Sequence, residues 1–144
     1  MALTHLNTDE IRTHIVECLA PGQFCSGETL GEQLGISRAA VSNHIKCLNE
    51  LGLDIYSVSG KGYKLAKPLI VLNKNAIVAH LPKSASDKLV VLNVIDSTNQ
   101  YIKTHQTELQ NGFVCLAEAQ TAGRGRLGRV WVSPYGASLY LSMH

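Results

Sequence analysis

Apolar side chains recur at helical spacing three times in the first third of the chain. A first helix is predicted after the capping residues 7–10, and its inner face consists of Ile11, Ile15, Cys18 and Leu19. A second, short helix is predicted over 27–34, and Gly35 suits the tight turn that follows it. Ser37 caps a third helix, whose inner face consists of Val41, Ile45, Leu48 and, at its end, Leu51. This layout is typical of a helix-turn-helix.

Two short strands, 54–58 and 63–65, follow with a Ser-Gly-Lys-Gly turn between them and indicate a β-wing. A winged helix-turn-helix reads DNA with its third helix in the major groove, commonly as a dimer on paired half-sites. The polar and cationic residues placed to contact bases or phosphates are Ser37, Arg38, Ser42, Asn43, Lys46, Lys61 and Lys64. The alternative is a small three-helix domain used only for packing or protein contacts.

The pattern changes after Lys67-Pro68-Leu69, where strands and helices begin to alternate. We expect a winged helix-turn-helix domain over 1–66, a linker over 67–73 and a second domain over 74–144. The second domain is predicted to contain a short helix over 73–81, a buried apolar strand over 88–95, a helix capped by Asp96 or Ser97 and running to about Leu109, and strands over 113–119 and 138–143. The fold class is therefore α+β, with the first part of a mixed sheet.

Composition adds limits but little direction. The 144 residues are 45% hydrophobic with a formal charge of +2, which is typical of a soluble protein, and no apolar run approaches the ~20 residues of a membrane helix. We expect a cytoplasmic protein without a membrane partner. The cysteines and histidines lack the spacing of metal ligands, so no metal site is predicted.

The segment between Gln120 and Trp131 carries the clearest chemical signal. Within seven residues it holds three glycines and three arginines: Gly123, Gly125 and Gly128, and Arg124, Arg126 and Arg129. Glycine lets backbone approach a ligand, and arginine offers a fork of donors to carboxylate or phosphate. Dinucleotide-fold, kinase and P-loop motifs each lack their required context here. A mobile, arginine-bearing lid over an anion remains, against the alternative of a solvated basic loop.

Three stretches together resemble a known family. Asp96-Ser97-Thr98-Asn99 follows an apolar run, the glycine–arginine segment lies between Gln120 and Trp131, and Leu-Tyr-Leu-Ser-Met occupies 139–143. These stretches resemble the biotin protein ligases. With the DNA-binding segment, the chain resembles the bifunctional bacterial ligases that also repress the biotin operon. The resemblance implies a biotin and adenylate site formed by Ser97, Thr98, Asn99, Gln120, Gly123, Arg124, Gly125, Arg126, Arg129 and Trp131.

The resemblance also implies a chemistry. Biotin and ATP, with Mg²⁺, would give biotinoyl-AMP, and Arg126 would be the catalytic residue nearest the carboxylate and phosphate. Biotin would then pass to a lysine of the biotin carboxyl carrier protein. Biotinoyl-AMP would act as corepressor by favouring a homodimer on the biotin operator DNA.

One departure from the family bears on activity. The family's Lys-Trp-Pro-Asn-Asp segment does not occur in the 144 residues, so we expect a truncated catalytic domain without ligase activity on its own. The alternative is a stand-alone winged helix-turn-helix regulator with a vestigial ligand pocket.

Overall fold

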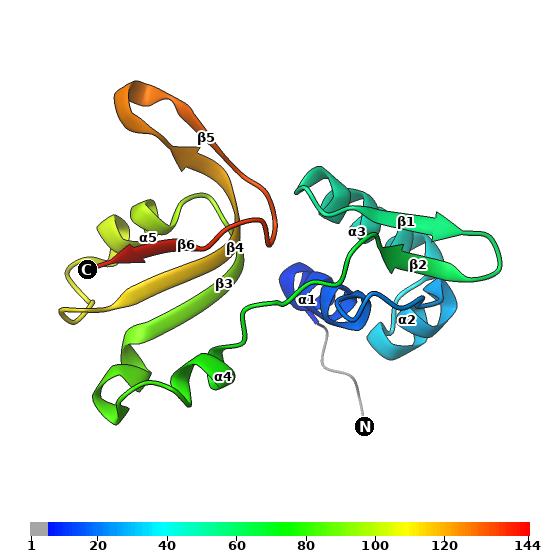
Figure 1. The fold of residues 1–144 in the computed structure, drawn as a ribbon, viewed down its shortest axis with the longest axis horizontal. Helices are drawn as coiled ribbons and strands as arrows, with labels where there is room; N and C mark the ends of the chain where they lie inside the picture. Colours follow the sequence, from blue (N-terminus) through cyan, green and yellow to red (C-terminus); the bar gives the residue numbers. More distant parts are fainter. Residues whose placement is uncertain (1–5) are drawn as a thin grey trace. The chain divides into compact units, whose positions relative to one another are not determined.

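The structure is a computed structural model that describes residues 6–144. The chain divides into two compact units, Met1–Val71 and Leu72–His144 (Figure 1). The division lies inside the 67–73 stretch in which the sequence pattern changes. Each unit is described separately below.

Within residues 6–71 the elements follow the predicted order. They are α1 (Thr8–Leu19), α2 (Gly27–Leu34), α3 (Arg38–Glu50), β1 (Ile55–Val58) and β2 (Gly62–Leu65). Strands β1 and β2 pair antiparallel, from Ile55 opposite Leu65 to Val58 opposite Gly62, and form the wing. The predicted winged helix-turn-helix is therefore confirmed, with element bounds within a residue or so of those expected.

Each helix of this unit begins at a cap that the sequence supplies. Asn7 and Glu10 form a capping box at α1: the Glu10 amide donates to Asn7 Oδ1 at 2.9 Å, and the Asn7 amide donates to Glu10 Oε2 at 2.8 Å. Ser26 and Ser37 cap α2 and α3 through their hydroxyl oxygens. Gly35 ends α2 in the left-handed region at φ 65°, a conformation that glycine adopts without strain.

The core of this unit follows the predicted faces with two differences. Its most buried side chains are Ile15, Val16, Leu19, Leu30, Val41 and Leu48. Cys18 is only half-buried, whereas Val16 is buried. These two residues flank the apolar stripe of α1 on opposite sides, and periodicity does not decide which side is covered. Leu51 is half-buried because it caps the end of α3 with ψ 0°, outside the helix.

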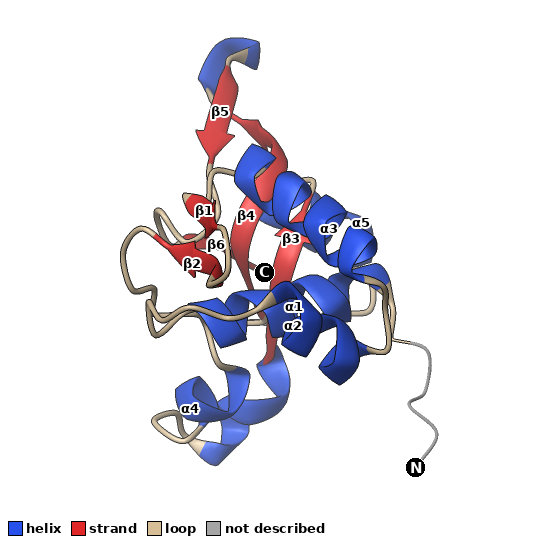
Figure 2. Ribbon diagram, turned by 90° about the vertical axis from the view of Figure 1, so that its right-hand side faces the viewer, coloured by secondary structure: helices blue, strands red, loops and turns tan. Residues whose placement is uncertain are grey.

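Within residues 72–144 the order is α4 (Lys74–Val78), the 3₁₀ helix η1 (Lys83–Lys88), β3 (Leu89–Ile95), α5 (Thr98–His105), β4 (Val114–Arg124), the 3₁₀ turn η2 (Arg126–Gly128), β5 (Val130–Ser133) and β6 (Tyr140–Met143). Strand β4 is the centre of the sheet. Residues 89–95 of β3 pair with it in parallel, whereas β6 pairs antiparallel with its first part and β5 with its last part. Figure 2 shows β4 continuing into the hairpin with β5. The predicted mixed sheet of an α+β fold is confirmed.

Both predicted helices of this unit are shorter than expected. After Val78 the chain closes tight turns, with the Leu81 amide donating to the Val78 carbonyl at 3.0 Å, and Pro82 follows. After His105 the carbonyl of that residue accepts from the amides of Glu108 and Leu109, and the last turn tightens. Apolar periodicity continues past both ends, so the sequence pattern overestimated the helices.

The prediction of a buried strand over 88–95 is wrong in degree. Only Leu89 is buried, and the other residues of β3 are half-buried. In the part of the chain that the structure describes, β3 pairs with β4 alone, so one of its edges faces no strand. An apolar run indicates a strand but does not state how many neighbours cover it.

Candidate functional site

A cleft of about 380 Å³ lies in the second unit, between α5, β4, the β5 hairpin and β6. Eight of the ten residues predicted for ligand binding line this cleft: Ser97, Thr98, Asn99, Gln120, Arg124, Gly125, Arg126 and Trp131. They are separated by up to 34 positions in the sequence. The fold therefore brings the hydroxyl and amide groups after β3 to the same cavity as the arginines of the glycine-rich segment.

The polar start of α5 forms one wall of the cleft. Ser97 caps α5, its Oγ accepting from the Gln100 amide at 3.4 Å, and its own amide donates to Asp96 Oδ1 at 2.6 Å. Ser97 and Thr98 are 5% and 3% exposed, whereas Asn99 is exposed. The wall therefore offers two buried hydroxyls and one solvent-facing amide.

Gln120 joins three strands and a helix at the back of the cleft. Its Oε1 accepts from the Thr98 amide at 2.9 Å and from Thr98 Oγ1 at 3.2 Å, and its Nε2 donates to Ser133 Oγ at 3.0 Å. Thr98 Oγ1 also lies 2.9 Å from Ser142 Oγ on β6. A carboxamide has two N–H donors, and the bond to Ser133 uses one of those of Gln120, while the Gln120 oxygen accepts from Thr98.

The glycine–arginine segment, which the sequence analysis took for a loop, is a β-hairpin. Residues 120–124 continue β4, 130–133 form β5, and the reversal lies at Gly125–Arg129. The Gly125 amide donates to the Arg129 carbonyl at 2.7 Å across this reversal. The sequence reading missed the hairpin because three glycines suggest a loop, whereas here they permit close pairing of two strands.

The remaining two predicted residues do not line the cleft. Gly123 lies behind it, where an added Cβ would stand 2.7 Å from the Trp131 carbonyl oxygen and 2.9 Å from Ser133 Oγ. Gly123 is thus needed for the strand pairing that carries Trp131 to the cleft. Arg129 is exposed and lies between η2 and the start of β5. At the tip, Leu127 adopts a φ of 59° and is 93% exposed.

Sequence reasoning assigned no role to the β6 residues of the cleft. Leu139, Tyr140, Leu141 and Ser142 line it, and the Tyr140 hydroxyl donates to the Pro134 carbonyl at 2.8 Å. Their signal was available, because Leu-Tyr-Leu-Ser was one of the stretches that carried the resemblance. It was read as a strand only.

A buried carboxyl lies on β4, close to the cleft. Glu118 is 3% exposed and accepts a hydrogen bond from the Leu72 amide at the start of this unit. Burial raises the pKa of this carboxyl, and the hydrogen bond from Leu72 acts in the opposite direction. Burial also raises the pKa of the neighbouring Cys115 thiol, to about 11. Among residues 6–144 no group of three or more His, Cys, Asp or Glu could hold a metal ion.

The predicted DNA-binding residues occupy two faces of the first unit. Arg38 at the start of α3 and Lys61 at the wing tip line one cleft of about 380 Å³, whereas Lys64 lies outside it. Ser42 is half-buried, and Asn43 and Lys46 are exposed further along α3. Ser37 is exposed, and its Oγ accepts from the Ala40 amide at 3.1 Å as the helix cap. Its hydroxyl hydrogen is still free to donate to a phosphate.

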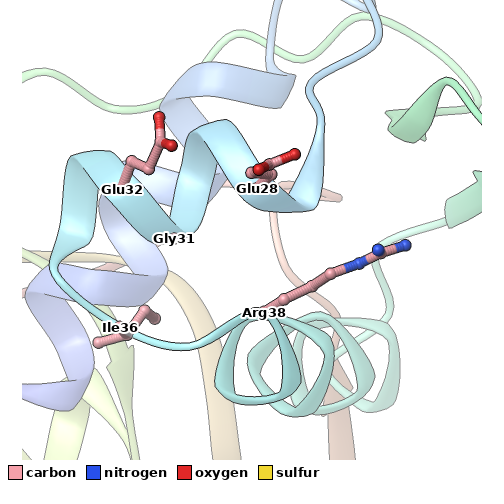
Figure 3. A pocket seen from close by; sticks show the side chains of 5 residues that line it. All are labelled: Glu28, Gly31, Glu32, Ile36 and Arg38. Carbon is pink, nitrogen blue, oxygen red and sulfur yellow. The ribbon is translucent and has the colours of Figure 1, made fainter.

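The turn before α3 forms a second hollow, lined by two carboxylates, beside Arg38. Its lining residues are Glu28, Gly31, Glu32, Ile36 and Arg38 (Figure 3). An added Cβ on Gly31 would stand 2.7 Å from the Ile36 carbonyl oxygen, so glycine is required where the turn crosses α2. Figure 3 shows the guanidinium of Arg38 extending from the start of α3. Glu28 also lines the cleft that contains Arg38 and Lys61, so a carboxylate lies beside these two cations.

Each unit contains a segment that is similar to a known protein family. Residues 12–64 match the HTH domain family, and residues 91–144 match the biotin/lipoate A/B protein ligase family. The two matches cover separate segments of the chain, one in each compact unit.

The same combination occurs in curated relatives. The chain is 51% identical over 130 residues to the bifunctional ligase/repressor BirA of Salmonella typhimurium (strain LT2), covering 90% of this chain and 40% of the relative. The Escherichia coli (strain K12) protein of the same name is 51% identical over 129 residues, with 90% and 39% covered. The Bacillus subtilis (strain 168) protein is 33% identical over 139 residues, with 92% and 42% covered. In sequence and domain order, the chain is similar to the N-terminal part of these bifunctional ligase/repressors.

A solved structure shares part of the sequence. The biotin protein ligase from Aquifex aeolicus in complex with biotin and ATP is 42% identical over 38% of this chain and 22% of its own, with a TM-score of 0.34. The chain spans about 40% of the length of the curated relatives it matches. None of the described helices is long and apolar enough to cross a membrane.

Proposed function

We propose that this chain contributes operator-DNA binding and part of a biotin-activating site to a bifunctional biotin protein ligase and repressor, with residues 67–73 linking the two. The observation that carries the ligase half is the cleft. Eight residues that the motif resemblance selected for biotin and adenylate meet at one cavity of about 380 Å³. A volume of this order suits a small ligand such as biotin.

Within this proposal the two walls of the cleft bind different parts of biotin. The hydroxyls of Ser97 and Thr98, the Asn99 amide and the free N–H of Gln120 match the hydrogen-bonding ureido group of biotin. Trp131 supplies an apolar surface beside them, because it lines the same cleft. The hairpin wall, with Gly125 at its reversal, faces the carboxylate end.

In this proposal the arginines of the hairpin stabilise negative charge on the phosphates of ATP. In the proposed reaction a carboxylate oxygen of biotin attacks the α-phosphorus of ATP, and the bond to pyrophosphate breaks. Arg126 stabilises the negative charge that develops at the α-phosphate, and Arg124 contributes from the same wall. Mg²⁺ would accompany ATP and offset the negative charge of its phosphates. Arg129 is a second phosphate contact if the hairpin tip bends over the adenylate.

Further parts of the proposal rest on the resemblance to bifunctional biotin protein ligases. Biotinoyl-AMP is the corepressor and favours a homodimer that occupies the biotin operator. The biotin carboxyl carrier protein is the acceptor of the activated biotin, through attack of a lysine amine that releases AMP. These steps take place in the cytoplasm.

A binding assay on the 144-residue chain tests the ligase half. The purified chain is incubated with biotin, labelled ATP and Mg²⁺, and protein-bound biotinoyl-AMP is measured beside biotin binding alone. We expect biotin binding that is weakened by Asn99→Ala, and no adenylate formation without the rest of the ligase domain. In the full ligase, Arg126→Ala should prevent adenylate retention, whereas Lys103→Ala, an exposed cation of α5 outside the cleft, should not.

Two results would contradict the proposal for the ligase half. Adenylate formed by the chain alone would mean that its residues suffice for activation. A folded chain that binds no biotin would refute the ligand assignment of the cleft, and would leave the alternative of a regulator with a vestigial pocket.

Selection from a random double-stranded DNA library tests the DNA half. A specific duplex should be recovered and bound by wild type. Arg38→Ala should weaken that binding, because an arginine at the start of the reading helix contacts bases or phosphates. Lys83→Ala is the matched control, an exposed cation in the second unit. Equal affinity of Arg38→Ala and Lys83→Ala would exclude α3 as the reading helix.

A further inference from the structure

A half-exposed phenylalanine lies beneath the two cations of the wing. Phe24 is 38% exposed, and its ring meets the Tyr56 ring edge-on, with centroids 6.1 Å apart and an interplanar angle of 89°. Lys61 Nζ lies 5.7 Å and Lys64 Nζ 5.3 Å from the Phe24 centroid. Phe24 therefore contacts both lysines that the sequence nominated for the DNA backbone.

Backbone pairing fixes this arrangement. Next to Phe24, the Cys25 amide donates to the Tyr63 carbonyl at 2.9 Å, and the Tyr63 amide donates to the Cys25 carbonyl at 2.8 Å. Lys64 is in turn the register partner of Tyr56. Because side chains alternate along strands, Phe24, Lys64 and Tyr56 form a row on one face of the wing. The ring is thus held by the sheet rather than by a flexible loop.

The ring changes what the two lysines can do. Lysine side chains on a protein surface are ordinarily free to rotate, and ordering them on a ligand costs conformational entropy. The negative face of an aromatic ring attracts an ammonium group and restricts it, while leaving N–H donors free. Two cations beside one ring also repel each other, and an anion that contacts both offsets that repulsion.

The position of the pair favours backbone phosphates over base edges. Lys61 lines the cleft with Arg38 at the start of α3, whereas Lys64 lies outside that cleft on the row with Phe24. The Phe24 ring therefore contacts one cation of that cleft and one cation outside it. Phosphate contacts are the kind that fix register on the duplex without reading sequence.

We propose that Phe24 is a positioning residue that holds Lys61 and Lys64 in place for the phosphates of duplex DNA. The proposal rests on the DNA binding put forward above. It assigns a DNA-binding role to a residue that need not touch DNA itself.

A double-mutant comparison on the whole chain tests it. Affinity for a random-sequence DNA duplex is measured by fluorescence anisotropy over a series of salt concentrations, for wild type, Phe24→Leu, Lys61→Ala/Lys64→Ala, and the triple variant. Leucine keeps an apolar side chain but removes the ring, and Phe24→Tyr restores a ring as the control. Phe24→Met replaces Phe24→Leu if circular dichroism shows that leucine unfolds the domain.

We expect Phe24→Leu to bind about threefold more weakly than wild type, as the loss of exposed cation–π contacts predicts, and Phe24→Tyr to bind as wild type. The double lysine variant should reduce the salt slope of log K by about two, one for each lost phosphate contact. Phe24→Leu should have no further effect in that background. The ring-current shifts of the Lys61 and Lys64 Hε protons in NMR spectra should disappear in Phe24→Leu.

The possible failures are distinguishable. If wild type shows no salt-dependent duplex binding, the proposed DNA-binding function fails and this inference with it. If the double lysine variant loses affinity but Phe24→Leu does not, only the positioning role is refuted. If Phe24→Leu weakens binding equally with and without the lysines, Phe24 acts independently of them and the proposal is also overturned.

Discussion

Replacing Thr98 by valine removes the hydroxyl that links β4 and β6 through the start of α5. Valine has nearly the same shape, so the change isolates the hydrogen bonds. Thr98 Oγ1 lies 3.2 Å from Gln120 Oε1 and 2.9 Å from Ser142 Oγ, and Thr98 is 3% exposed. The variant therefore deletes two contacts at the back of the ligand cleft without opening a cavity.

The size of the effect follows from the partners left behind. A neutral hydrogen bond contributes about 0.5–1.5 kcal/mol, and a buried polar group left unpaired costs about 1–3 kcal/mol. Gln120 Oε1 keeps its 2.9 Å bond from the Thr98 amide, and Ser142 is half-buried and therefore open to water. Because neither Gln120 Oε1 nor the Ser142 hydroxyl is left without a hydrogen-bond partner, we expect a loss of about 1–2 kcal/mol in the free energy of unfolding of this unit.

Urea unfolding followed by tryptophan fluorescence measures this loss. Trp131 is the single tryptophan of the chain and lines the same cleft, so its signal reports on the second unit. Thr98→Ser keeps the hydroxyl and is the matched control, with a smaller loss expected from the missing methyl group. A Thr98→Val stability equal to or above that of Thr98→Ser would refute the reasoning that these hydrogen bonds stabilise the cleft.

Three further predictions concern β4 and its hairpin. Gly123→Ala should destabilise the second unit by about 1–3 kcal/mol, because the new Cβ overlaps backbone; urea titration measures the loss, and unchanged stability would contradict the close approach at Gly123. Burial raises the pKa of Glu118, so the protonated form is favoured and stability falls as pH rises through the raised pKa. Glu118→Gln should therefore be more stable than wild type above the raised pKa of Glu118, but not below the ordinary value of 4.5. Unfolding titrations of both proteins at several pH values measure this, and a stability difference that stays constant with pH would count against it. Because the pKa of the Cys115 thiol is about 11 and the side chain is buried, alkylation at pH 8 should label it only in urea; rapid labelling of folded protein would contradict its burial.

The first unit could be predicted almost completely because its signals are local. The caps at Asn7 and Ser37 and the left-handed Gly35 act within one helical turn, and the structure uses them at those positions. What the pattern missed there was contact across the sheet. The position of Phe24 against the wing depends on the Cys25–Tyr63 backbone pair, which joins residues 38 positions apart.

In the second unit the identities of the cleft residues could be predicted, but not the shape that joins them. Motif resemblance selected Ser97 and Arg126, and the fold brings both to one cleft. The hairpin was read as a loop because glycine is ambiguous: at Gly123 it permits two strands to approach, and only the partner strand shows this.

The sequence by itself determined the helix boundaries of the first unit, the α+β class and the residue types of a ligand site, because caps, periodicity and motifs depend on neighbours along the chain. Only the tertiary structure decided that the Gln120 side-chain oxygen accepts a hydrogen bond from Thr98, that β3 is half-buried and that Phe24 contacts two lysines. Each of these depends on a partner far away in sequence. Such contacts are set by how strands pair and pack, and local periodicity carries no record of that choice.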